Sequence, residues 1–162
     1  MVIVLFGVSG AGKTTLGRLL AAELGWRFYD GDDYHCAASV EKMRRGIPLT
    51  DVERRPWLEK LRALIDERIA NGENAALACS ALKESFRRFL RSDRDEVKLV
   101  YLQGNYSLME ERLMTRHGHF MNSELLQSQF DTLEEPAGDT VAIAIDQTPP
   151  EIVEQIRKAL KL

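Results

Sequence analysis

A single glycine-rich segment, residues 7–14, limits the possible folds of this chain more than anything else in its sequence. It has the sequence GVSGAGKT, which matches the pattern G-x-x-x-x-G-K-[ST] at every fixed position. The apolar run Val2–Phe6 precedes it and leucines at helical spacing follow it, which is the strand–loop–helix context that the pattern requires. Glycines let the backbone curl so that its N–H groups point at phosphate oxygens, and the start of the helix adds the positive end of its dipole. The segment therefore predicts a binding loop for a nucleoside triphosphate.

Two side chains of this loop have chemistry of their own. Lys13 is expected to reach the β and γ phosphates, and the Thr14 hydroxyl is a candidate ligand of Mg²⁺. We expect the triphosphate to contact the whole loop and the first turn of the helix: Gly7, Val8, Ser9, Gly10, Ala11, Gly12, Lys13, Thr14 and Thr15.

Short apolar runs alternate with helical stripes along the rest of the chain. Strands are expected at residues 2–6, 27–30, 75–79, 97–102 and 141–145. Helices are expected from about residue 16 to Gly25, from near Pro56 to Gly72, over residues 106–116 and after Pro149. Continuously apolar strands alternating with amphipathic helices predict a three-layer α/β/α fold with a five-stranded parallel sheet. The 162 residues contain no repeat or linker, so a single domain over residues 1–162 is expected.

Composition argues against several kinds of partner. The chain has 22 Lys and Arg against 25 Asp and Glu, a net charge of -3, which disfavours nucleic acid. No apolar stretch approaches the ~20 residues of a membrane span, and the start of the chain lacks the pattern of a secretory signal. Cys36 and Cys79 form no CxxC pair and suit a reducing compartment as free thiols, or simply as small buried residues. We therefore expect a cytoplasmic protein that binds neither nucleic acid nor membrane.

The use of the triphosphate depends on residues outside the loop. No Asn-Lys-x-Asp string is present to recognise guanine, so a GTPase switch is disfavoured, whereas carboxylates follow the second predicted strand in the sequence Asp30-Gly-Asp-Asp33. Ligands bind beyond the carboxyl ends of strands in such sheets, which would bring this cluster to the phosphate loop. One carboxylate could hold Mg²⁺ through water and another could accept the proton of an attacking hydroxyl. An exposed acidic turn is the alternative, and Asp146, after the last strand, is a rival carboxylate.

Basic side chains occur four residues apart on the predicted helix 106–116. Arg112 and Arg116 would share one face of this helix, where they could bind phosphate oxygens or simply be solvated. The segment that follows, approximately residues 117–124, is expected to form a lid over the phosphates. His117 and His119 have no further metal-ligating residue nearby, which argues against a zinc site.

Several segments together resemble a known family. Residues 28–35 (FYDGDDYH), 79–83 (CSALK) and 116–121 (RHGHFM), with the loop 7–14, are similar to the gluconokinases, P-loop small-molecule kinases related to shikimate and adenylate kinases. The similarity extends over nearly the whole chain. The resemblance implies the P-loop kinase fold and transfer of the ATP γ-phosphate to the 6-hydroxyl of D-gluconate. It also implies Mg²⁺ and a homodimer.

The resemblance also implies roles for individual residues. Asp32 would be the catalytic base, with Lys13 and Arg116 stabilising the transferring phosphoryl group. Asp30 would order water bound to Mg²⁺, and Arg112 would lie against adenine. The sugar-acid pocket would be lined by six residues: Asp32, His35, Arg54, Lys83, Arg87 and His119.

Other interpretations of these residues remain open. Lys83 and Arg87, four apart, could form a solvated helix face, and Arg54 could pair with Asp51. Trp57 and Phe130 are expected in the core rather than at a ligand.

The chain departs from the family pattern at three positions, where Cys36, Ser39 and Ser123 replace the usual Pro, Asn and Pro. The alternative functions are a kinase for another sugar acid or for shikimate, and a nucleotide-binding sensor without catalysis. The presence of Lys13, Asp32 and the arginines before the lid disfavours the sensor.

Overall fold

A five-stranded parallel sheet forms the centre of the molecule. The computed structural model describes residues 1–115, 123–138 and 140–162. The strand order is β2-β3-β1-β4-β5, and all four pairings are parallel, which confirms the predicted sheet. The strands are β1 (Val2–Phe6), β2 (Arg27–Asp30), β3 (Ala75–Cys79), β4 (Val97–Gln103) and β5 (Val141–Ala144).

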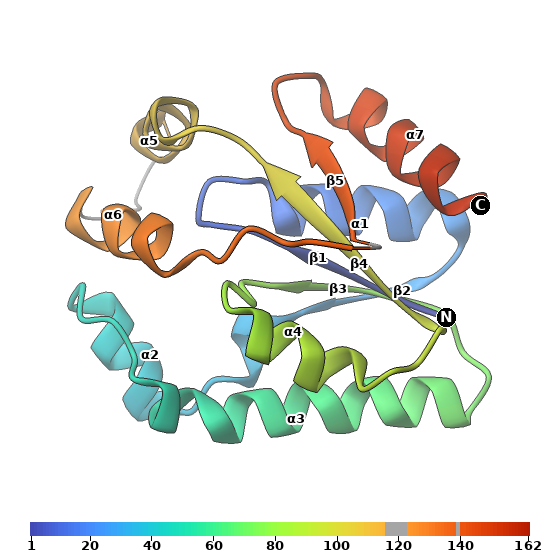
Figure 1. Ribbon diagram of the computed structural model, residues 1–162, viewed down its shortest axis with the longest axis horizontal. Coiled ribbons are helices and arrows are strands. Elements are labelled where there is room, and N and C mark those ends of the chain that lie inside the picture. Colours follow the sequence, from blue (N-terminus) through green and yellow to red (C-terminus); the bar gives the residue numbers. More distant parts are fainter. Residues whose placement is uncertain (116–122, 139) are drawn as a thin grey trace.

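The central strands are buried on both faces because helices cover both. Every residue of β1 and β3 is buried, and Val2 lies opposite Ala75 on one side and Val97 on the other. Helices α1 (Lys13–Leu24) and α7 (Pro149–Leu160) pack on one face, and α3 (Asp51–Ala70) and α4 (Glu84–Arg91) on the other (Figure 1). The predicted three-layer architecture is therefore confirmed.

Three further helices gather beyond the carboxyl ends of the strands. These are α2 (Ala37–Arg44), α5 (Tyr106–Thr115) and α6 (Ser123–Thr132), all at the left of Figure 1. The predicted lid, residues 117–124, falls mostly outside the described residues, and its last two residues begin α6. Within the described ranges, no helix is both long enough and apolar enough to cross a membrane.

Helix α3 begins earlier than the sequence suggested. It starts at Asp51, because Thr50 and Glu53 form a capping box in which each side chain accepts a hydrogen bond from the other's backbone N–H. Pro56 lies inside the helix, where it removes one backbone donor. The two reciprocal bonds at Thr50 determine the start of the helix, five residues before the expected one. This extra turn brings Asp51 and Arg54 to the carboxyl ends of the strands.

Candidate active site

A cleft of about 810 Å³ opens at the carboxyl ends of the strands. Its walls come from the phosphate loop, the end of β2, helices α2 and α6, the start of α3 and the connection from β3 to α4. Predicted site residues that line it are Ser9, Gly10, Gly12, Lys13, Thr14, Asp30, Asp32, His35, Arg54 and Lys83. A smaller hollow of about 450 Å³, between β4 and α6, shares no residue with the phosphate loop. The larger cleft is therefore the candidate active site.

The phosphate loop has the backbone shape that its glycines permit. Gly10 and Gly12 have φ angles of 85° and 86°, in the left-handed region that favours glycine. A Cβ atom on Gly10 would lie 3.0 Å from the carbonyl oxygen of Met109, so the loop also packs closely against α5. Helix α1 starts after Gly12 without a side-chain cap. A glycine-rich loop that leads into an uncapped helix start suits an anion such as phosphate.

Lys13 lies over this loop. Its Nζ donates hydrogen bonds to the carbonyl oxygens of Gly7 and Val8, both at 3.0 Å, which holds the ammonium group at the mouth of the loop. The backbone N–H of Ser9 donates to Oε1 of Gln129 at 2.6 Å. Gln129 belongs to α6 and lines the cleft, a position for which no site role was predicted. Helix α6 therefore reaches the phosphate loop directly.

Thr14, the predicted ligand of Mg²⁺, contacts Asp30, which was predicted to hold the ion through water. The Thr14 hydroxyl donates to Oδ2 of Asp30 at 2.7 Å, and Oδ1 of Asp30 accepts from the backbone N–H of Asp32 at 3.2 Å. Hydroxyl and carboxylate oxygens are ligands that Mg²⁺ prefers, with water and phosphate completing the shell. No group of three or more His, Cys, Asp or Glu in the described part of the chain could hold a metal by itself. The residues fit a Mg²⁺ ion that arrives with the triphosphate. The rival carboxylate, Asp146, does not line the cleft.

Asp32 lies on a short 3₁₀ helix, η1 (Gly31–Tyr34), that follows β2 directly. Gly31 is buried against β3, and a Cβ atom there would lie 2.6 Å from the carbonyl oxygen of Ala78. Only glycine fits this close approach. The Asp32 carboxylate is exposed in the cleft, at the end of a turn that is packed tightly where it leaves the sheet.

His35 follows the same turn and stacks on Trp57. Their ring centroids are 4.6 Å apart and the planes differ by 9°. Burial lowers the pKa of His35 below its usual value, so the ring is neutral near pH 7. Trp57 is 3% exposed, as expected of a core residue, but it also lines the cleft. The sequence suggested the first role of this tryptophan and missed the second.

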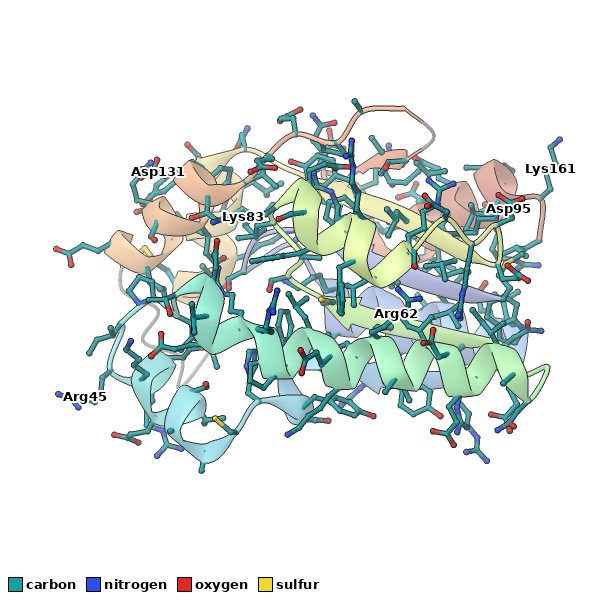
Figure 2. All side chains as sticks on the ribbon, turned by 60° about the horizontal axis from the view of Figure 1, so that its bottom comes forward. Arg45, Arg62, Lys83, Asp95, Asp131 and Lys161 are labelled. Carbon is teal, nitrogen blue, oxygen red and sulfur yellow. The ribbon has the colours of Figure 1, made fainter. Side chains whose placement is uncertain are left out.

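Two cations from different elements also line the cleft. Arg54, on the first turns of α3, is partly buried, and burial lowers the pKa of its guanidinium while Asp51 and Glu53 counteract this. Lys83 lies immediately before α4, and its Nζ donates to Oδ2 of Asp51 at 2.6 Å; Figure 2 shows it beside the start of α3. Asp51 therefore pairs with Lys83 rather than with Arg54.

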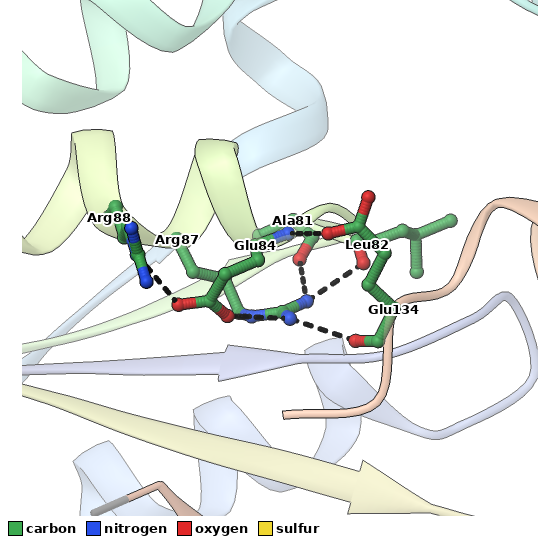
Figure 3. A network of polar contacts seen from close by, with 6 residues as sticks. All are labelled: Ala81, Leu82, Glu84, Arg87, Arg88 and Glu134. Atoms are coloured by element: carbon green, nitrogen blue, oxygen red, sulfur yellow. Dashed lines mark hydrogen bonds and ion pairs between the residues drawn. The ribbon is translucent and has the colours of Figure 1, made fainter. Parts of the chain in front are cut away.

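Arg87 does not reach the cleft, contrary to what the resemblance implies. Its side chain is fully buried and donates to the carbonyl oxygens of Ala81 (3.1 Å), Leu82 (2.8 Å) and Glu134 (2.8 Å) and to the Glu84 carboxylate (Figure 3). Its guanidinium also lies 5.0 Å from the centroid of the Phe6 ring. The alternative that the spacing offered, a solvated helix face shared with Lys83, is wrong as well, because Arg87 is fully buried and Lys83 is the residue before α4. Arg87 is a structural residue that ties three chain segments together.

The remaining predicted residues fall outside the cleft or outside the described residues. Arg112 donates to the carbonyl oxygen of Ile145, at the end of β5, and does not line the cleft. Arg116 and His119 lie outside the described residues. Of the loop residues, Gly7, Val8 and Ala11 are buried and Thr15 is exposed on α1. Their contacts with a triphosphate stay predictions.

Two departures from the family pattern, Cys36 just before α2 and Ser39 within it, contact each other. The Cys36 sulfur lies 3.3 Å from Oγ of Ser39, and hydrogen bonds from the side chain and backbone of Ser39 to the thiolate lower the pKa of this exposed thiol. Ser39 is buried beneath it and does not line the cleft. Cys79 is buried at the end of β3, which raises the pKa of its thiol to about 12.

Comparison with known proteins gives consistent results. Residues 9–161 match the model of the shikimate kinase family. The chain is 42% identical to a probable gluconokinase of Mus musculus, over 99% of this chain and 97% of that protein. It is 41% identical to the thermosensitive gluconokinase of Escherichia coli K12, over 97% of this chain and 86% of that one. A solved gluconokinase structure from Sinorhizobium meliloti 1021 superposes with a TM-score of 0.86 at 44% identity, covering 98% of this chain and 90% of that one.

Proposed function

Because the chain belongs to the shikimate kinase family and, within it, to the gluconokinases, we propose that it phosphorylates D-gluconate. The reaction transfers the γ-phosphate of ATP to the 6-hydroxyl and gives 6-phospho-D-gluconate and ADP. One observation supports this most directly: a single cleft joins the phosphate loop, the Asp32 carboxylate and a cationic wall formed by Arg54 and Lys83. Phosphorylation of a sugar acid needs all three. The loop holds the phosphates of ATP, a carboxylate accepts the proton of the hydroxyl, and the cations neutralise the carboxylate of the acid.

The chain's own residues divide the chemistry of transfer between them. The glycine-rich loop and Lys13 hold the β and γ phosphates. Asp32 accepts the proton of the attacking 6-hydroxyl as the bond to phosphorus forms and ADP leaves. Thr14, and Asp30 through water, would hold Mg²⁺, which would neutralise phosphate charge when bound. Asp30 also keeps Asp32 in place by accepting its backbone N–H.

The cationic wall would recognise the other end of the acceptor. Arg54 offers paired donors to the gluconate carboxylate, and Lys83 adds positive charge beside it. His35, neutral near pH 7, would hydrogen-bond hydroxyls of the sugar acid. The resemblance supports three further roles. Arg116 would stabilise the transferring phosphoryl group, Arg112 would lie against adenine, and His119 would bind the sugar acid.

Further parts of the proposal concern conditions and assembly. We include a requirement for Mg²⁺, a homodimeric state and a cytoplasmic location, which the family resemblance and the free thiols support. Chelation by EDTA is expected to abolish turnover, and light scattering during gel filtration is expected to give twice the chain mass of 18.4 kDa. A monomeric mass would remove the dimer and leave the activity proposal intact.

The decisive experiment is a panel of acceptors assayed with ATP and Mg²⁺. ADP release should depend on gluconate, and acceptors that lack one of its hydroxyls should be rejected strongly, because the site's polar groups would be left unpaired. If the enzyme prefers another sugar acid or shikimate, that acid replaces gluconate as the proposed substrate. Tight ATP binding with no phosphorylated product from any acid would favour the sensor.

A matched pair of variants tests the base. Asp32→Asn should still bind ATP but turn over about 10²–10⁴-fold more slowly, the usual contribution of a general base. Asp33→Asn is the control, because Asp33 is the adjacent exposed carboxylate and does not line the cleft. If Asp32→Asn and the control turn over equally fast, Asp32 is not the base.

A further inference from the structure

Trp57 contacts both ends of the turn that carries Asp32. Its indole N–H donates to the carbonyl oxygen of Gly31 at 2.7 Å, in a buried position. Its ring face stacks on His35 at 4.6 Å. Gly31 begins the 3₁₀ turn and His35 directly follows it, so Asp32 lies between two points that are held by the same residue.

The stack also determines where the imidazole of His35 lies. Within the described ranges, Nδ1 of His35 is buried and has no hydrogen-bond partner. The ring is therefore positioned by its contact with Trp57 rather than by a hydrogen bond to protein. Trp57 is itself rigid, because it is 3% exposed in the core between α3 and the sheet.

We propose that Trp57 is a positioning residue for phosphoryl transfer: its N–H orients Asp32 through Gly31, and its ring face orients His35. This inference rests on the proposed function and assigns a residue that the family resemblance does not. The two contacts are separable, because the N–H bond acts on the base and the stack acts on the sugar-acid side of the cleft. A displacement of about 1 Å in a reacting group can cost about 10²-fold in rate, so a small shift of the turn is enough to matter.

Two variants separate the contacts. Trp57→Phe keeps an aromatic face and removes the N–H donor, which leaves the buried carbonyl of Gly31 unpaired. We expect kcat to fall about 10- to 100-fold, with KM for gluconate changed less than about threefold and KM for ATP unchanged. Trp57→Leu removes both contacts, and KM for gluconate should then rise as well. Trp26→Phe is the matched control, because Trp26 packs against the opposite core cluster, away from the cleft.

A second measurement does not depend on turnover. The pKa of His35, followed by NMR, should rise toward its usual value in Trp57→Leu, because the ring loses the cover that desolvates it, and should stay near the wild-type value in Trp26→Phe. Asp32, Arg54 and Lys60 also act on this pKa, and none of them is altered in either variant.

The outcomes distinguish this inference from the proposed function. If wild type phosphorylates gluconate and Trp57→Phe has the same kcat, the inference fails and the function stands. If wild type prefers another acid, the proposed substrate fails, and the same kcat comparison is made with that acid. A Trp57→Phe variant that only unfolds more easily, with normal kcat in its folded fraction, assigns Trp57 a structural role alone. If no acid is phosphorylated, an unchanged His35 pKa in Trp57→Leu overturns the inference.

Discussion

Replacing Arg87 by Met should destabilise the protein without weakening its binding of gluconate. The methionine side chain occupies a similar space but offers no donor to the carbonyl oxygens of Ala81, Leu82 and Glu134. Ala81 is buried, so its carbonyl has no access to replacement water. The Leu82 carbonyl still accepts the backbone N–H of Glu134 at 2.9 Å, and Glu134 itself is exposed. A buried polar group left unpaired costs about 1–3 kcal/mol, and here that group is the Ala81 carbonyl.

Other terms adjust this value only in part. Loss of the guanidinium contact with Phe6 adds about 0.5–2 kcal/mol. Against this, the variant no longer has to bury a charged group, which offsets part of the loss. We therefore expect the free energy of unfolding to fall by about 1–2 kcal/mol, a sizeable fraction of the ~5–15 kcal/mol that holds an ordinary domain together.

The assay is urea unfolding at about 25 °C, paired with steady-state kinetics at a low temperature where the variant is fully folded. Arg88→Met is the matched control. Arg88 contacts the same Glu84 carboxylate at 3.3 Å, but its side chain is 81% exposed (Figure 3), so its loss should change stability by less than about 0.5 kcal/mol. In Arg87→Met, KM for gluconate should stay within about twofold of wild type.

Two results would refute this reasoning. Unchanged stability in Arg87→Met would mean that the carbonyl network contributes nothing. A KM for gluconate raised by more than about tenfold in fully folded protein, with kcat unchanged, would return Arg87 to the substrate pocket.

Two further predictions concern titratable groups. Iodoacetamide at about pH 7.5 should label Cys36 in the native protein, because its thiol is exposed and has a lowered pKa. It should label Cys79 only after unfolding, because this thiol is buried and its pKa is raised to about 12. Peptide mass spectrometry distinguishes the two cysteines, and labelling of Cys79 in native protein would contradict its burial. Hydrogen bonds from Lys42 and Thr50 lower the pKa of Glu53 from 4.5 to about 2. Its stabilising contribution is therefore complete above pH 4.5 and is lost as pH falls through about 2. Glu53→Gln should lower the urea midpoint near neutral pH, and its midpoint should fall less on acidification than the wild-type midpoint does. Equal falls in the variant and the wild type would contradict the role of Glu53.

Local patterns predicted the parts of the site that depend on local structure. The phosphate loop could be predicted because its glycines, Lys13 and Thr14 act within a few residues of one another. The contact between Thr14 and Asp30 was predictable from topology, since the carboxyl ends of parallel strands meet at one edge of the sheet, even though β3 lies between β1 and β2. The start of α3 was predicted less well. The helical pattern placed it near Pro56, whereas the capping box of Thr50 and Glu53 starts the helix at Asp51.

The order of residues along the chain determined the alternating α/β architecture, the phosphate loop and the carboxylate turn that ends at His35, because each depends on neighbours in sequence. Tertiary structure alone decided which cations face the cleft. Arg54 and Lys83 line it, whereas Arg87, only four residues beyond Lys83, is buried where a carbonyl 47 residues away completes its hydrogen bonds. No spacing along one helix can show where such distant acceptors converge, and the same holds for Trp57, whose partner Gly31 is 26 residues away. A side chain's role is determined by the charges and acceptors that the fold brings to it.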